Sequence, residues 1–69
     1  MQEFELDGHE YIELCNLLKL TGITGSGGMA KMLIADGQVL VDGEVELRKR
    51  CKIRSGQVIE CLDETIEVT

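Results

Sequence analysis

The sequence has almost no aromatic residues, with one Phe, one Tyr and no Trp among its 69 positions. The core must therefore be aliphatic, and a hydrophobic content of 43% is enough to build one. A chain of this length has room for one domain of modest stability, so residues 1–69 are expected to form a single domain.

Cysteine and histidine are scarce as well. The three cysteines form no Cys-x-x-Cys pair, and His9 is the only histidine. An odd number of cysteines without a secretory signal is typical of free thiols in a reducing compartment. We therefore expect no metal, no cofactor and no disulfide.

Groupings that could support catalysis are missing too. Catalysis needs a nucleophile with a base, paired carboxylates in a cleft, or a metal. His9 precedes the first predicted helix, where a capping or surface role is the simpler interpretation. The sequence therefore predicts no catalytic residue and no enzyme activity.

Long hydrophobic runs are absent. The longest nearly apolar stretch, from Met29 to Ala35, is interrupted by Lys31 and is far too short to span a bilayer. The start of the chain has no basic region of the kind that directs export. We expect a cytoplasmic protein that has no membrane partner.

The pattern of the first half of the chain predicts a strand followed by two helices. Phe4 and Leu6 alternate with acids, which predicts a half-buried strand. Apolar residues then recur with helical spacing from Tyr11 to Leu18, and Leu17 and Leu20 widen this apolar face. Gly22 is placed to end the first helix in a left-handed conformation. A second helix is expected from the N-cap Ser26 to Asp36, with Gly37 as its stop.

The second half is rich in β-branched residues. Val39–Val41, Asp42-Gly43 and Glu44–Glu46 predict a hairpin with a two-residue turn. Gln57–Cys61 and Thr65–Val68 are expected to form further strands. This order of elements predicts an α+β fold, in which a two-helix hairpin packs on a small, mostly antiparallel sheet.

The positive charges are concentrated in one place. The net charge is −6, yet five of the seven basic residues lie in residues 48–54, Arg-Lys-Arg-Cys-Lys-Ile-Arg, the basic segment. If this segment is extended, its even-numbered side chains share one face while Cys51 and Ile53 face the core. These even-numbered residues are Arg48, Arg50, Lys52 and Arg54. A row of like charges suits a polyanion, but it could also be a solvated run that protects an edge strand from pairing.

No aromatic residue accompanies the basic segment in the sequence, so base stacking is not expected to be the main mode of binding. A second candidate site is the start of the second helix, at Ser26, Gly27, Gly28 and Lys31. Free amides at a helix start attract anions, and two glycines leave them unobstructed. The alternative is a flexible turn in which the glycines relieve crowding.

The chain from Glu13 to Glu60 resembles the alpha-L RNA-binding motif, the family named for ribosomal protein S-four, and in particular its short stand-alone bacterial members of the YbcJ type. The matching runs are Glu13–Leu20, Ser26–Lys31, Gly37–Gly43, Glu46–Ile53 and Gly56–Gln57. The resemblance implies two helices followed by a small sheet, with RNA bound on a basic surface. Carried over to this sequence, it implies RNA contacts from Lys31, Arg48, Lys49, Arg50 and Lys52, with Ser26 to Gly28 nearby. Gly27 and Gly28 stand where the family often has arginines, which points to weaker or more selective binding.

The resulting prediction is a non-catalytic, monomeric RNA-binding module that contacts RNA phosphates through the basic segment, including Arg54, and through the second helix. Structured RNA such as ribosomal RNA is the expected partner, and no small-molecule substrate is expected. One alternative is an adaptor that uses the basic segment on an acidic protein. Another is a small β-grasp carrier, although those proteins resemble one another in ending with Gly-Gly and this chain ends Glu67-Val68-Thr69.

Overall fold

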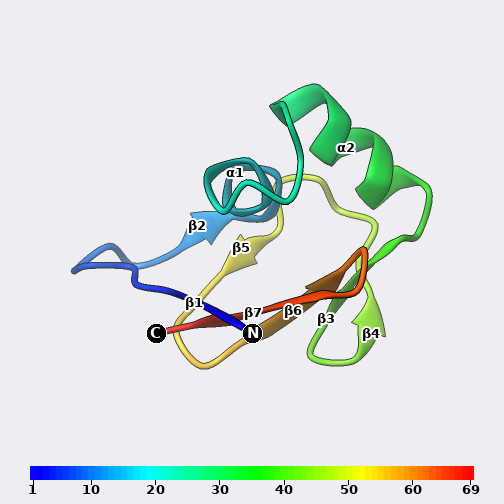
Figure 1. The fold of residues 1–69 in the computed structure, drawn as a ribbon. Coiled ribbons are helices and arrows are strands. Elements are labelled where there is room, and N and C mark those ends of the chain that lie inside the picture. The colour runs from blue at the N-terminus through cyan, green and yellow to red at the C-terminus, as the bar shows by residue number, and fades with distance from the viewer.

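The computed structural model describes all residues from 1 to 69 and contains two helices and seven short strands (Figure 1). In chain order these are β1 Gln2–Phe4, β2 Ile12–Glu13, α1 Leu14–Leu20, α2 Gly27–Ala35, β3 Val39–Val41, β4 Glu44–Val45, β5 Lys52–Ile53, β6 Val58–Cys61 and β7 Glu64–Val68. Both helices lie on the same side of the larger sheet in Figure 1, and they pack against each other. The predicted α+β class is confirmed.

The strands form two separate sheets. The larger one has the order β1-β7-β6-β3-β4, in which β1 runs parallel to β7 and all other neighbours are antiparallel. The smaller one is an antiparallel pair of β2 and β5, in which Ile12 lies opposite Ile53 and Glu13 lies opposite Lys52. The prediction of a mostly antiparallel sheet is therefore confirmed, with β1 as the exception.

The core lies between the helices and the inner face of the larger sheet. Its largest fully buried side chains are aliphatic, as the shortage of aromatic residues predicts. They are Leu14, Leu17, Leu18 and Ile34 from the helices, and Val39, Ile53, Ile59, Ile66 and Val68 from the strands. Burial alternates along β6 and β7, so one face of this sheet packs on the helices and the other meets solvent. Neither helix has the length and apolar character needed to cross a lipid bilayer.

The first helix starts later than its apolar spacing predicts. Tyr11 lies outside the helix and is exposed, because Ile12 and Glu13 pair with β5 and keep the chain extended up to Leu14. Leu20 was expected on the apolar face, but 65% of it is exposed at the end of α1. Gly22 does adopt the left-handed conformation predicted for it, with a φ of 81°.

The second helix and the hairpin follow the sequence closely. The hydroxyl of Ser26 accepts a hydrogen bond from the amide of Met29 at 3.1 Å, as an N-cap should. Asp42 and Gly43 have φ values of 52° and 85°, as the predicted two-residue turn requires. A second turn of the same kind, at Leu62 and Asp63 with φ of 51° and 64°, joins β6 to β7. That turn was not predicted, because leucine is not a turn-forming residue.

Candidate nucleic-acid interface

The basic segment is only partly extended. Lys49 and Arg50 form a turn that is closed by a hydrogen bond from the Cys51 amide to the Arg48 carbonyl at 3.2 Å, and only Lys52–Ile53 is a strand. The expected row of four cations on one extended face is therefore wrong. Cys51 and Ile53 are buried as predicted, but the side chain of Lys49, expected on their side, is exposed. The segment presents its charges around a turn.

The main chain of this segment is fixed to the first helix. The carbonyl of Cys51 accepts a hydrogen bond from the Leu14 amide at 2.9 Å, and the carbonyl of Lys49 accepts one from the Cys15 amide at 3.1 Å. These carbonyls satisfy amides at the start of α1, where no side chain caps the helix. These two hydrogen bonds hold the basic turn against the N-terminus of α1.

Arg48 is already paired with a carboxylate. Its Nε and Nη2 atoms donate to the two carboxylate oxygens of Glu46 at 3.0 Å each, and its amide donates to the same carboxylate at 2.9 Å. These hydrogen bonds from Arg48 lower the pKa of Glu46 to about 2. The carboxylate in turn raises the pKa of Arg48. An RNA phosphate would have to compete with Glu46 for this guanidinium.

The other cations of the basic segment differ in whether a carboxylate pairs with them. Arg54 donates to the carboxylate of Glu10 at 3.1 Å. Lys49, Arg50 and Lys52 form no ion pair, although Glu13 lies opposite Lys52 in the strand register. Arg48, Arg50, Cys51 and Lys52 line a shallow hollow of about 400 Å³. Burial is the main cause that raises the pKa of the Cys51 thiol, so this thiol stays protonated at neutral pH.

The structure adds an aromatic residue to the basic segment. Lys52 Nζ lies 5.0 Å from the centre of the Tyr11 ring, and Arg54 Cζ lies 5.7 Å from it, both within cation–π range. Tyr11 comes from the residues just before β2, so pairing of β2 with β5 creates this contact. The helical spacing of apolar residues predicts Tyr11 in a helix, so this contact could not be foreseen from the sequence. Residues 7–10, Asp-Gly-His-Glu, contain no apolar residue, so no local alternation in the sequence indicated the strand at Ile12–Glu13.

The second candidate site is at the start of α2. Ser26, Gly27 and Gly28 start α2, and Lys31 is exposed on the same helix. No hydrogen bond or ion pair connects them to the basic segment. A methyl group added at Gly27 would meet nothing, and one added at Gly28 would meet only the Ser26 hydroxyl at 3.9 Å, so the helix start is open. Anion binding there stays a prediction.

The cysteines and the histidine do not form a further site. All three cysteines are buried as free thiols, and no three His, Cys, Asp or Glu residues converge in a way that could hold a metal ion. His9 is exposed in the turn that follows Leu6, where its amide donates to the Leu6 carbonyl at 3.1 Å. The basic segment with Tyr11 is therefore the main candidate binding site.

Comparison with known proteins gives the family. The profile of the S4 domain family matches residues 4–69, nearly the whole chain. The chain belongs to the S4 domain family. Within it, the chain is 52% identical over 68 residues to the "Putative RNA-binding protein YbcJ" of Escherichia coli strain K12, covering 99% of this chain and 97% of that protein. It is also 41% identical over 51 residues to the "Probable ribosome maturation protein RlbA" of Bacillus subtilis strain 168, covering 74% of this chain and 72% of that protein.

Solved structures agree with this family assignment. The solution structure of YbcJ, described as revealing an alpha-L motif involved in RNA binding, has a TM-score of 0.78, is 51% identical, and aligns with 100% of this chain and 87% of that one. Ribosomal protein S4e from Thermoplasma acidophilum shares the fold with a TM-score of 0.62 at 24% identity, over 83% of this chain and 30% of that one. The S4 domain assignment confirms the resemblance to the alpha-L family, and it rules out the β-grasp alternative.

Proposed function

We propose that this S4 domain is a non-catalytic RNA-binding module and that its 69 residues act as one domain. The observation that carries the proposal is the turn at residues 49–52, whose main chain is hydrogen-bonded to the start of α1 and where Lys49, Arg50 and Lys52 have no acidic ion-pair partner in a chain of net charge −6. Exposed cations held at fixed positions bind phosphates and release counterions from the nucleic acid. The relatives support this proposal, because both YbcJ and its solved structure are described in terms of RNA binding.

The charges divide the proposed contacts into two groups. Lys49, Arg50 and Lys52 bind phosphates directly, while Arg48 and Arg54 must first exchange a carboxylate for a phosphate. Lys31 and the open amides after Ser26 provide a separate, weaker phosphate site at the start of α2. Phosphate contacts position an RNA but do not read its sequence.

The RNA is proposed to be structured, such as a ribosomal RNA helix with its loop. Cations around a compact turn suit the closely spaced phosphates of a folded RNA, and Tyr11 lies against two of these cations, Lys52 and Arg54. The description of RlbA as a ribosome maturation protein supports ribosomal RNA as the class to test first.

The test is a titration of a ribosomal RNA hairpin and of a single strand of equal length with three proteins. These are the native chain, the double variant Lys49→Ala/Arg50→Ala, and Lys19→Ala as a control on an exposed lysine of α1 outside the proposed site. We expect the native chain to bind the hairpin more tightly than the single strand. The double variant should bind both RNAs at least tenfold more weakly, which corresponds to a loss of about 0.7 kcal/mol for each of the two contacts. The Lys19→Ala variant should bind like the native chain.

The proposal fails if the native chain binds neither RNA. It also fails if Lys19→Ala weakens binding as much as the double variant, since binding would then depend on total charge alone. If an acidic protein but no RNA binds at residues 49–52, the adaptor alternative is correct.

A further inference from the structure

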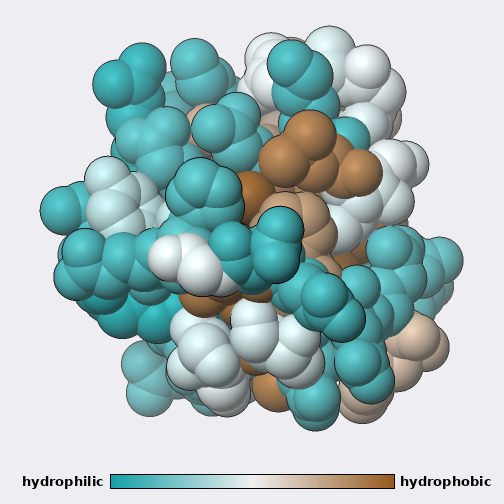
Figure 2. All heavy atoms as spheres, turned by 90° about the vertical axis from the view of Figure 1, so that its left-hand side faces the viewer, coloured by the Kyte–Doolittle hydropathy of each residue, from teal (hydrophilic) through white to brown (hydrophobic).

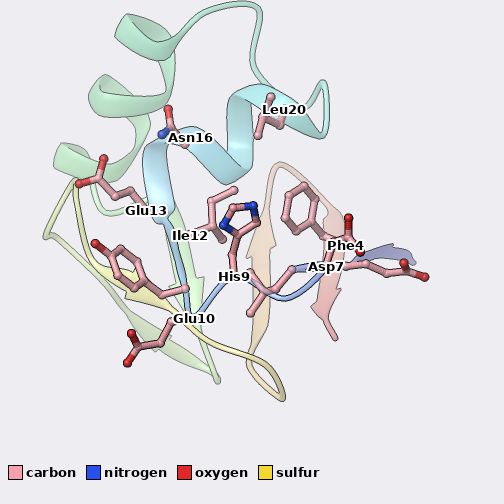
Figure 3. Close-up of a pocket in the computed structure, with 11 residues that line it drawn as sticks. Phe4, Asp7, His9, Glu10, Ile12, Glu13, Asn16 and Leu20 are labelled. Carbon is pink, nitrogen blue, oxygen red and sulfur yellow. The ribbon is translucent and has the colours of Figure 1, made fainter.

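A groove of about 600 Å³ lies between the β1 end of the sheet and the first helix, on the face shown in Figure 2. Its apolar lining consists of Phe4, Leu6, Ile12 and Leu20, together with the edge of Tyr11. Its acidic lining consists of Glu5, Asp7, Glu10 and Glu13. Figure 3 shows Phe4, His9 and Ile12 around the centre of the groove and Glu10 and Glu13 at its margin. This acidic groove therefore combines an apolar floor and the polar side chains of His9 and Asn16 with a negatively charged border.

The charges in the acidic groove are only partly compensated. No lysine or arginine lines it, and Arg54 reaches its border only through the ion pair with Glu10. Glu13 lies opposite Lys52, but Glu5 and Asp7 have no cationic partner. Such a surface repels RNA phosphates and attracts a cationic ligand.

The acidic groove also offers main-chain hydrogen-bonding groups. Strand β1 is at the edge of the sheet, and the main chains of Phe4 and Leu6 bond to Thr69 on the β7 side. The amide and carbonyl of Glu5, which lies between them, form no hydrogen bond in the protein. An extended peptide lying along this edge can pair with them as an added strand does.

An apolar anchor completes the acidic groove. Leu20 is 65% exposed at the end of α1, next to the half-buried Phe4 and Ile12. An aliphatic side chain inserted here would remove this apolar surface from water. We propose that the acidic groove binds an extended, basic segment of a partner protein, with an aliphatic side chain packed against Leu20. This inference goes beyond RNA binding and does not depend on it.

Tyr11 places the two surfaces next to each other. One side of this residue lines the acidic groove, while its ring is held by Lys52 and Arg54 of the basic segment. RNA on the basic segment and a basic peptide in the groove would therefore lie side by side, with Tyr11 between them. A partner with basic residues that also bind RNA would contact both the acidic groove and the RNA on the basic segment.

The experiment uses the full chain, labelled for NMR, and a short capped peptide in which Lys and Arg alternate with Leu. The main variants are Glu5→Lys, which reverses a groove charge, and Leu20→Ala, which removes the anchor. Their matched controls are Glu60→Lys, an exposed acid on the outer face of the sheet, and Met32→Ala, which is 67% exposed on α2. Because all four side chains are exposed, each variant should retain the native urea midpoint.

We expect amide shifts centred on residues 4–13 and 20, and affinity about fivefold or more weaker in Glu5→Lys and in Leu20→Ala, with both controls unchanged. A matched peptide with Glu in place of Lys and Arg should not bind. The proposal is overturned if the basic peptide does not bind, if it shifts other residues instead, or if Glu60→Lys weakens it as much as Glu5→Lys. It is also overturned if RNA, and no basic peptide, shifts the groove residues.

Discussion

At the scale of single residues, the pairing of Arg48 with Glu46 is expected to limit what Arg48 adds to RNA binding. The Arg48 side chain is 77% exposed, whereas that of Glu46 is only 17% exposed. The carboxylate is therefore fixed in place, and the guanidinium that it holds points into solvent. Glu46 both orients Arg48 and competes with phosphate for it.

Replacing Glu46 with Gln tests this competition. The neutral amide no longer holds Arg48 as an ion pair, so this arginine becomes available to phosphate. We expect RNA affinity to rise about two- to fivefold, which corresponds to the free energy of one exposed ion pair. The matched control is Glu44→Gln, which removes a charge from β4 that has no ion pair. Equal gains in the two variants would mean that only net charge matters.

The same residue makes stability depend on pH. The pKa of Glu46 is lowered from 4.5 to about 2 in the folded protein, so the ionised carboxylate stabilises the fold above the unfolded value. That contribution is lost as the pH falls from 4.5 through about 2. Urea unfolding of the native chain and of Glu46→Gln should differ by roughly 1 kcal/mol at about pH 6 and converge toward about pH 2. A difference that does not change with pH would contradict the lowered pKa.

Tyr11 is expected to position Lys52 and Arg54 by contact with its ring. Tyr11→Leu should therefore weaken RNA binding about two- to fivefold, while Tyr11→Phe keeps the ring and should bind like the native chain. Because Tyr11 is the only tyrosine and there is no tryptophan, its fluorescence reports on this site directly. Equal losses in the two variants would assign the effect to the hydroxyl group, and no loss in Tyr11→Leu would remove Tyr11 from the site.

At the scale of elements, the β3–β4 hairpin supports the strand that follows the basic segment. The Asp42 carboxylate accepts a hydrogen bond from the Val58 amide at 2.9 Å, so the turn is tied to β6. Gly43 has a φ of 85°, which disfavours a β-branched side chain. Gly43→Val should destabilise the fold by about 1 kcal/mol or more. Gly28→Ala, a helical glycine with ordinary φ, should not destabilise it, and an unchanged urea midpoint in Gly43→Val would contradict the turn.

The sequence predicts the local elements of this fold better than their contacts. Ser26, Gly37 and the Asp42-Gly43 pair act within a few residues, so their roles follow from local backbone preferences. Cys51 and Ile53 were correctly assigned to the core because β5 keeps the chain extended there, although it turns at Lys49 and Arg50. The start of α1 was wrong because pairing between β2 and β5 joins residues far apart in the chain.

The candidate site was predictable in composition but not in geometry. Clustering of cations in residues 48–54 is visible in the sequence. The pairing of Arg54 with Glu10 and the approach of Lys52 to Tyr11 depend on β2 and β5 lying side by side, and no local pattern encodes them. The turn at Lys49 and Arg50 is likewise set by the carbonyls that must reach the start of α1.

At the scale of the whole molecule, the charge distribution is expected to orient a bound RNA. Residues 1–47 carry −7 and residues 55–69 carry −4, so −11 surrounds a segment of +5. Phosphates are repelled from most of the surface and attracted at one turn. This distribution favours few, well-placed contacts and disfavours binding of RNA in arbitrary orientations.

The central claim is that residues 49–52 bind RNA phosphates, and the dependence of RNA affinity on salt tests it most directly. Three cations without an ion pair, Lys49, Arg50 and Lys52, predict a log–log slope of roughly −2 to −3 for the native chain. Each substitution of Lys49 or Arg50 by Ala should reduce the slope by about one unit, and Lys19→Ala should leave it unchanged. If Lys49→Ala/Arg50→Ala retains both the affinity and the slope of the native chain, the basic segment is a solvated surface and does not bind RNA.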